Sequence, residues 1–299
     1  MVDEGHSSER KPLAPGLYLV ATPIGNLEDI TLRALRVLNS VDRIACEDTR
    51  QTQKLLNHFG ITTPTFSVHE HNETARAVEV VDELLAGKLI AVVSDAGMPG
   101  ISDPGMVLTK AAVEAGIPVF PVPGANAALS ALVASGLDTE QFLFLGFLPS
   151  KSGPRLTQLE TLRDRLREPV TILVYEAPHR ILETLADVAL VWGASCRVVL
   201  ARELTKIHEE FLRGTVSEVR AQLAERDRMR GEMVLLIEMR LQAVAVAADP
   251  VKLPERLAEL EKAEGLSEMD ALKRIARERG VSKSELYREL QRSRTKMRS

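Results

Sequence analysis

The chain has 299 residues, 45% hydrophobic and 27% charged, which is enough for two compact domains with ordinary cores. No apolar run approaches the roughly 20 residues of a transmembrane helix, and residues 1–14, expected to be a flexible leader, lack the apolar stretch of a signal peptide. The net charge is −4, and two cysteines without disulfide or zinc spacing suit a reducing compartment, so these features together predict a cytoplasmic protein.

The first part of the chain repeats a unit of apolar strand, polar loop and amphipathic helix. Because strands that alternate with helices at this spacing form a parallel sheet covered on both faces, we expect an α/β domain over residues 15–123. The expected strands are residues 17–21, 43–46, 65–68, 89–93 and 118–122.

A second α/β domain with a mixed sheet is expected over residues 124–241. A helix ends near Ser135, and another covers residues 156–166 after a loop at 149–154. The expected strands are residues 142–147, 170–175, 196–201, 210–212 and 233–239.

Residues 242–249 resemble a linker, and residues 250–299 predict a basic helical extension. Ser267 and Ser282 each begin a helix-capping pattern, with Gly280 between them, which outlines a helix-turn-helix. Residues 271–299 hold ten Lys and Arg and three Glu, a net charge of +7 that leaves −11 elsewhere. Such a segment suits a phosphate backbone, although a solvated helical face has the same composition.

The loops that follow the first five strands are expected to meet at one edge of the sheet, because parallel strands direct their carboxyl ends to the same side. No phosphate-binding glycine motif follows any of these strands, so a nucleoside triphosphate is disfavoured. A metal site built from His69 and His71 with Asp95 or Glu47 stays a minor alternative. Nucleophilic hydrolysis is disfavoured because no GxSxG motif is present and Cys46 ends a buried strand.

The remaining hypothesis is a cofactor that is bound without a phosphate or metal anchor. The loop SDAGMPGISDPG, residues 94–105, follows the fourth strand. Asp95 suits ribose hydroxyls or an ammonium group, and Gly97 allows close approach of the backbone. Asp103, which precedes Pro104, is interpreted as a turn-capping residue.

These loops and later motifs together closely resemble the ribosomal RNA small-subunit methyltransferase I family of the tetrapyrrole methylase superfamily. The resemblance runs from about residue 17 to 238, and the basic tail resembles an extension of some members. The matching motifs are ATPIGNLEDITLRA, CEDTR, HEHNE, SDAGMPGISDPG, PVPGANAALSALVASGL, FLGFLP, YEAPHR, RELTKIHEEFLRGT and GEMVLLIE.

The resemblance implies a class III methyltransferase fold of two α/β domains that hold S-adenosylmethionine between them. It also implies a homodimer and 2′-O-methylation of one cytidine in the decoding region of 16S rRNA, within the small ribosomal subunit. Ala96 and Ser94 depart from the superfamily's GDPxxY loop, which leaves individual contacts in that loop open. Matched by motif, the implied cofactor-binding residues are Pro23, Asp95, Gly97, Met98, Asn126, Ala127, Tyr175, Glu176, Gly214, Glu232, Met233 and Val234.

Transfer to a ribose hydroxyl needs alignment and a proton acceptor, for which Glu47, His69, Glu70 and Glu176 are candidates, with Glu47 and His69 preferred. The residues expected to face RNA are Arg50, Glu70, Lys151, Arg155, His179, Arg180 and Arg202.

Two other functions are compatible with parts of the pattern. One is a precorrin-type C-methyltransferase, which the basic tail and the loops CEDTR and YEAPHR disfavour. The other is a ligand-sensing DNA-binding regulator, which would shift duplex DNA in a gel and transfer no methyl group.

Overall fold

The computed structural model describes residues 12–69, 72–103, 105–240, 253–264, 267–279, 286–287 and 290. In this part of the chain the strands form two five-stranded sheets, which belong to one compact unit, and the tail helices form a second unit. The two-sheet α/β architecture with a helical extension is therefore confirmed. The expected leader, the linker and the Ser282 cap lie wholly or mostly outside the described residues, and the boundary at residues 123 and 124 stays a prediction.

The first sheet is entirely parallel, with strand order β3-β2-β4-β1-β5. Its strands are short apolar runs because both faces are covered by helices. They are β1 (Gly16–Val20), β2 (Arg43–Cys46), β3 (Thr65–Ser67), β4 (Leu89–Val92) and β5 (Val119–Val122).

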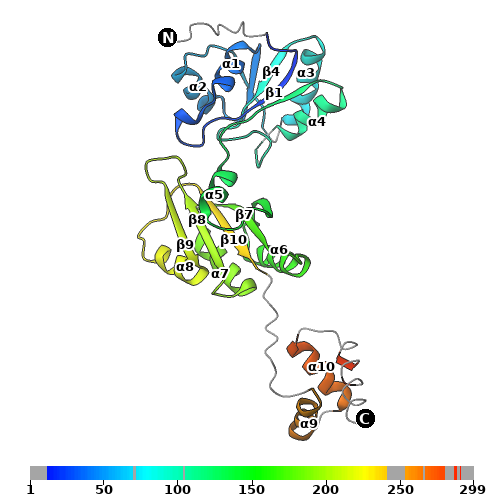
Figure 1. Cartoon of the computed structure of the whole chain (residues 1–299). Helices are drawn as coiled ribbons and strands as arrows, with labels where there is room; N and C mark the ends of the chain where they lie inside the picture. Colours follow the sequence, from blue (N-terminus) through cyan, green and yellow to red (C-terminus); the bar gives the residue numbers. More distant parts are fainter. Residues whose placement is uncertain are drawn as a thin grey trace, which may run out of the picture. The chain divides into compact units, whose positions relative to one another are not determined.

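Helices α1 (Leu32–Ser40) and α2 (Thr49–His58) cover one face of this sheet, and α3 (Glu73–Leu85) and α4 (Met106–Glu114) cover the other (Figure 1). Alternation along each strand divides the core between the two faces. In β2, for example, Ile44 packs toward α1 and α2, whereas Ala45 packs toward α3 and α4.

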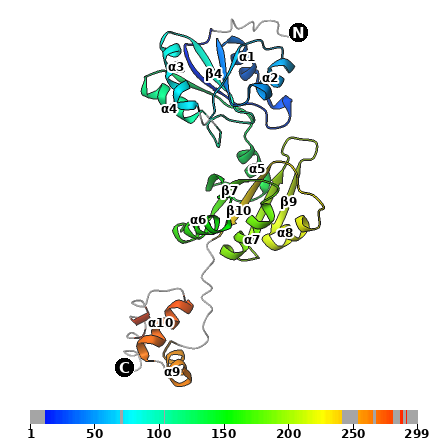
Figure 2. The ribbon, with the colours of Figure 1, turned by 180° about the vertical axis from the view of Figure 1, so that it is seen from behind.

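The second sheet is mixed, with strand order β6-β7-β10-β8-β9, and only the β6–β7 pair is parallel. Figure 2 shows its strands from behind, with α6, α7 and α8 beside them. The strands are β6 (Phe142–Phe147), β7 (Val170–Glu176), β8 (Arg197–Arg202), β9 (Glu210–Thr215) and β10 (Met233–Met239).

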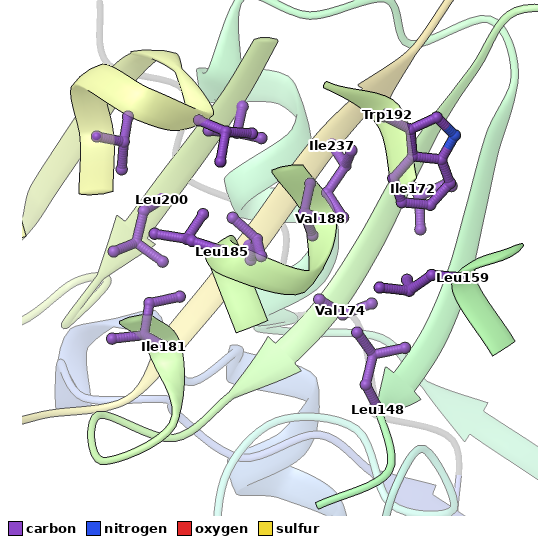
Figure 3. Close-up of a cluster of buried hydrophobic side chains, with 14 of the residues drawn as sticks. Leu148, Leu159, Ile172, Val174, Ile181, Leu185, Val188, Trp192, Leu200 and Ile237 are labelled. Carbon is purple, nitrogen blue, oxygen red and sulfur yellow. The ribbon is translucent and has the colours of Figure 1, made fainter. Parts of the chain in front are cut away.

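One face of the second sheet is covered by α6 (Ser152–Arg165), α7 (Ile181–Trp192) and α8 (Val216–Ala224). In Figure 3, Ile181, Leu185 and Val188 of α7 pack against side chains of the strands. These positions follow helical spacing, a signal that predicts α7 although it was not among the expected elements. The opposite face of the sheet packs on α5 (Ala127–Ser135).

Helix α6 begins at Ser152, four residues earlier than the sequence indicated. Pro154 therefore lies in the first turn of the helix. Backbone N–H groups there have no acceptor within the helix, so proline, which lacks an N–H, breaks no helical hydrogen bond. The expected loop at residues 149–154 is thus half helix.

The tail contains α9 (Leu253–Glu264) and α10 (Glu268–Arg279), which pack through a small apolar cluster that includes Leu257, Leu260 and Leu272. Ser267 accepts a hydrogen bond from the Asp270 backbone at 3.3 Å, so the predicted N-terminal cap of α10 is confirmed.

Arg155 is fully buried in the second domain, which corrects its assignment to an RNA-facing surface. Its Nε donates to Asp187 at 2.6 Å, and its Nη1 donates to the Pro149 and Ser150 carbonyls at 3.4 and 3.2 Å. Ser152 donates to the same Asp187 carboxylate at 3.0 Å. The guanidinium therefore fastens α6 to α7 and holds the loop that precedes α6.

Replacing Arg155 by Ala should lower the free energy of unfolding by about 3–5 kcal/mol, because it leaves a buried Asp187 carboxylate without its cation. Urea titration followed by circular dichroism measures the change. Arg163→Ala, on the exposed side of the same helix, is the matched control and should change stability by less than about 0.5 kcal/mol. Equal effects of the two variants would contradict the structural role of Arg155.

Candidate active site

A cavity of about 310 Å³ lies where the loops after the strands of the first sheet meet one end of the second sheet. From the first side it is lined by the predicted residues Gly97, Met98, Asn126 and Ala127. From the second it is lined by the predicted Tyr175, Glu176, Glu232, Met233 and Val234. The size is that of a small-molecule site.

The loop after β4 is joined to the loop after β1 by backbone pairing. Thr22 and Gly97 exchange N–H···O hydrogen bonds of 2.9 and 3.0 Å. The buried Ser94 hydroxyl donates to the Gly97 carbonyl at 3.1 Å, and Thr22 Oγ1 donates to the Ser94 carbonyl at the same distance. Gly97 has a φ of 83°, a left-handed conformation that favours glycine, so its backbone can face the cavity.

The far end of the same loop is held by Glu73, a buried residue of α3. Its Oε1 accepts hydrogen bonds from the backbone N–H groups of Gly105 at 2.8 Å and Val107 at 3.1 Å. Glu73 thus caps α4, whose own N-cap residue, Gly105, has no side chain for the purpose.

The middle of the loop touches β6 of the second sheet. Ser102 adopts a φ of 62°, which is costly for a residue with a side chain, and its Oγ would lie 3.0 Å from a Cβ built on Gly146. Gly146, with a φ of 63°, stands in the β-bulge that interrupts β6 before Phe147. A larger residue at position 146 would therefore push against the loop.

Strained backbone is concentrated around the cavity. Among the described residues, the non-glycine residues with positive φ are Ser102, Glu203 and Thr205. Ser102 lines the cavity, and Glu203 and Thr205 flank Leu204, which also lines it. Such strain persists where the surrounding structure fixes the chain, and it is commonly found at functional sites.

The wall on the side of the second sheet is aromatic and apolar. The Tyr175 ring lies 5.0 Å from the Phe144 ring and 5.6 Å from that of Phe147, in edge-on contacts. Burial raises the pKa of Tyr175, and the Asp103 carboxylate raises it further, so the phenol stays neutral at physiological pH.

Three residues implied by the resemblance are not among those that line the cavity. Pro23 is buried directly before Ile24, which does line it, and Asp95 precedes the lining residue Ala96. Gly214 pairs with Val198 near the end of β9 that lies away from Ala201, a lining residue of β8. Gly231, whose φ is 90°, lines the cavity, as Gly97 does.

The expected proton acceptors occupy different environments. Glu47 and His69 follow β2 and β3 but are not among the lining residues, and Glu70 lies outside the described residues. His69 donates its backbone N–H to Asn72 Oδ1 at 2.9 Å, and its ring Nε2 lies 3.1 Å from Asn72 Nδ2.

Glu176 lines the cavity, but its carboxylate is already satisfied within the second domain. Its Oε1 accepts from the Ala177 backbone and from Arg180 Nε, both at 2.8 Å, and its Oε2 accepts from Thr184 Oγ1 at 2.5 Å. These contacts leave the buried Glu176 little capacity to take a proton from a substrate.

Asp103 is a cavity-lining acid that sequence reasoning did not place in the site. It was interpreted as a turn residue, yet the structure places it, half-buried, in the cavity wall. Burial raises its pKa to about 6, and the charges of Glu47 and Asp95 add to the effect. The repeated Ser-Asp pattern at residues 94–95 and 102–103 was the available signal, because both acids lie in one loop after a buried strand.

The cationic residues expected to face RNA divide into two groups. Lys151 and His179 are exposed, and the Arg50 side chain is 87% exposed beside Asp48, whose pKa it lowers to about 2 through a side-chain hydrogen bond. Arg180 and Arg202 are partly buried: Arg180 pairs with Glu176, and Arg202 pairs with Glu210 at 3.0 Å.

The described residues contain no group of three or more His, Cys, Asp or Glu side chains placed to hold a metal ion. His71, part of the metal alternative, lies outside those residues. In the described part of the chain, no helix has the length and apolar character that crossing a membrane requires.

Two sheets, each covered by helices, and a largely apolar cavity at their junction make up the site. The chain belongs to the tetrapyrrole (corrin/porphyrin) methylase family, whose model matches residues 16–220.

Curated relatives named ribosomal RNA small subunit methyltransferase I are similar over most of the chain. The relative from Halalkalibacterium halodurans is 47% identical, covering 91% of this chain and 93% of its own. The relative from Vibrio cholerae is 53% identical, covering 75% and 77% respectively.

The fold is also that of a solved uroporphyrin-III C-methyltransferase from Thermus thermophilus, crystallised with S-adenosylhomocysteine. The TM-score is 0.51 at 17% identity, over 74% of this chain and 96% of that one. At this identity the likeness concerns the fold alone.

Asp103→Asn should raise the thermal midpoint by a few degrees at pH 8 and have little effect below pH 4. The folded-state pKa of about 6 lies above the ordinary value of 3.8, so the native protein loses stability as pH rises between these values and stays penalised above them. Calorimetric scans at both pH values measure the difference. A midpoint that does not rise at pH 8 would show that the carboxylate is not strained by burial.

Proposed function

We propose that this chain transfers the methyl group of S-adenosylmethionine to the 2′-hydroxyl of a cytidine in the decoding region of 16S rRNA, in the cytoplasm and as a homodimer. Membership of the methylase family and 42–53% identity to relatives named ribosomal RNA small subunit methyltransferase I support the enzyme class and an rRNA substrate. The ribose position and the nucleotide follow from the motif resemblance. Phe142 and Phe147, exposed on the edge strand β6, offer apolar surface for a second copy.

The cavity between the sheets is the observation that carries the proposal, because its wall suits a donor without a phosphate anchor. Gly97 and Gly231 bring backbone close to the cavity, and Met98, Met233 and Val234 supply apolar contact. We assign the donor's binding to these residues together with Asn126, Ala127 and Tyr175. Pro23 acts indirectly, by setting the position of Ile24.

Methyl transfer from a sulfonium needs alignment more than activation, because the leaving group is already good. The hydroxyl oxygen must approach the methyl carbon in line with the breaking C–S bond, and water must be excluded. The apolar cavity wall excludes water, and the fixed loop at residues 94–103 keeps the donor aligned.

Exposed Arg, Lys and His side chains on loops of the two sheets support an RNA substrate rather than a free tetrapyrrole. Arg50 follows β2, Lys151 precedes α6 and His179 follows β7. Together with the basic tail they form the set that we assign to RNA phosphates. Arg180 contributes by holding Glu176 and the Leu148 carbonyl, to which its Nη2 donates at 3.1 Å.

Incubation of the protein with methyl-labelled S-adenosylmethionine and small subunits from an unmodified strain should place label on one cytidine of 16S rRNA. That nucleotide should resist alkaline cleavage at its 3′ side, because a 2′-O-methyl group blocks the reaction. Label on uroporphyrinogen or a precorrin, with none on RNA, would refute the proposal.

Gly97→Val tests the cavity in the same assay. An added side chain would meet Ile24 Cγ2 at 3.3 Å and would strain a backbone with φ of 83°, so donor binding should fall at least tenfold. Gly153→Ala, where a Cβ has nothing within 4 Å, is the matched control.

Deletion of residues 250–299 should weaken binding to 16S rRNA and leave the affinity for S-adenosylhomocysteine unchanged. The tail supplies phosphate contacts, and so the slope of log affinity against log salt should become shallower. Filter binding over a salt series and calorimetry measure the two affinities. A parallel loss of cofactor affinity would show that the tail is structural.

Replacing Lys273 and Arg274, both exposed on α10, by glutamate tests the contribution of the tail to RNA binding without truncation. It should reduce the salt slope by about 2.

A further inference from the structure

The loop between β8 and β9, residues 203–209, contacts loops of both sheets. Toward the first sheet, its Thr205 Oγ1 accepts a hydrogen bond from the Asn26 backbone N–H at 3.1 Å. Toward the second, Glu203 donates its backbone N–H to the Glu232 carbonyl at 2.9 Å, and its Oε1 accepts from the Glu232 N–H at 3.0 Å. One short segment therefore joins the loop after β1 to the residue that precedes β10.

Lys206 lies at the centre of this junction and is bound by two carboxylates. Its Nζ donates to Glu203 Oε1 at 2.9 Å and to Glu232 Oε2 at 2.8 Å. Burial lowers the pKa of Lys206, but the hydrogen bonds to the two carboxylates together raise it above its ordinary value, so the ammonium stays charged at physiological pH. The aliphatic stem lies against Gly25, where a Cβ would stand 2.4 Å from Lys206 Cγ. Lys206 therefore contacts the second sheet through its charge and the first sheet through its stem.

The backbone of the β8–β9 loop is held in a costly conformation. Glu203 and Thr205 have φ of 51° and 65°, in the left-handed region. The Thr205 N–H donates to the Glu209 carboxylate at 2.7 Å, and the Lys206 N–H donates to the Glu203 carbonyl at 3.0 Å. On the side of β10, a Cβ built on Gly231 would stand 2.5 Å from Glu203 Cγ. The loop is thus fixed both by its internal hydrogen bonds and by its close fit to a glycine.

The segments that Lys206 joins form part of the cavity wall. Ile24 lines the cavity from the loop after β1, Leu204 from the β8–β9 loop and Glu232 from the entrance to β10. Lys206 itself is not among the lining residues. A change at Lys206 can therefore alter the separation of the walls without removing a side chain that contacts the donor.

We propose that Lys206 is a positioning residue that holds the two walls of the donor cavity at a fixed separation. The walls belong to different sheets, so the contacts of the β8–β9 loop supply a connection that strand pairing does not. A cavity fixed before the donor arrives needs less ordering when the donor binds, which strengthens binding. The inference rests on the proposed assignment of this cavity to the methyl donor.

Calorimetry with S-adenosylhomocysteine tests the role by comparing Lys206→Met with wild type. Methionine keeps most of the stem and removes the charge, so the Kd should rise about tenfold. Stopped-flow displacement should show that the increase lies mainly in the dissociation rate. In RNA methylation, the KM for S-adenosylmethionine should rise about tenfold while kcat at saturating donor stays within about threefold of wild type. A merely structural residue would not separate KM from kcat in this way.

Two further variants show whether the cation at this position is responsible. Lys206→Arg retains the charge and should keep the Kd within about threefold of wild type. Lys88→Met removes an ion pair of 3.0 Å with Glu83. Because Lys88 precedes β4, it lies at the opposite end of that strand from the cavity loop, and its replacement should leave Kd and KM unchanged. Circular dichroism confirms that each variant is folded.

A double-mutant cycle tests the contact between the sheets independently of the charge. Gly25 lies outside the left-handed region, so alanine adds no backbone strain there. Its methyl group would push the Lys206 stem aside, and Gly25→Ala should therefore weaken binding of S-adenosylhomocysteine. In Lys206→Ala the Cγ is absent, so the added methyl group should have a smaller effect, and the two changes should be less than additive.

Distinct outcomes separate the two levels of the argument. A wild-type protein that binds no S-adenosylhomocysteine refutes the assignment of the cavity to the donor. A wild type that binds it, with an unchanged Kd in Lys206→Met, refutes the role of Lys206 alone. Equal losses in Lys206→Met and Lys88→Met, or no recovery in Lys206→Arg, would also overturn that role. So would additive effects in the cycle, or a fall in kcat at unchanged KM.

Discussion

The paired backbone hydrogen bonds between Thr22 and Gly97 are the constraint on which the cavity depends. They join the loops after β1 and β4, two strands that are neighbours in the parallel sheet. Once these loops are joined, Ile24 and Met98 face the same space, and the remainder of the loop must cross toward the second sheet. The close approach of Ser102 to Gly146 and the capping of α4 by Glu73 then fix the path of this loop at both of its later points.

Charge is distributed in a way that suits a cationic donor. Negative groups gather beside the cavity, where burial raises the pKa values of Glu47, Asp95 and Asp103. The charge of Asp95 raises the pKa of Glu47 and of Asp103 further, and the charge of Glu47 adds to the effect on Asp103. Such a cluster is unfavourable in the empty protein, and a sulfonium would relieve it. Positive groups lie on exposed loops and in the tail, where they can meet a polyanion without neutralising the cluster.

Two arginines hold neighbouring elements of the fold through buried carboxylates. Arg155 fastens α6 to α7 through Asp187, and Arg180 fastens the end of β7 through Glu176. Both arginines lie in short basic segments, residues 150–155 and the motif YEAPHR, and composition cannot distinguish a buried arginine from an exposed one. Burial is decided by the carboxylate that the fold places opposite the arginine, and these partners lie 32 and 4 residues away in the chain.

The sequence by itself determined the strands, because short apolar runs between polar loops can only be buried in a two-sided sheet, and it determined the edge at which those loops meet. It also indicated part of the cavity wall, including Gly97, Asn126 and Tyr175, since ordered motifs retain their place in a shared fold. Only the tertiary structure decided that Asp103 and Gly231 line the cavity and that Arg155 is buried. The physical reason is that burial and charge proximity arise between segments distant in the chain, whereas a local pattern reports only the conformation of its own segment.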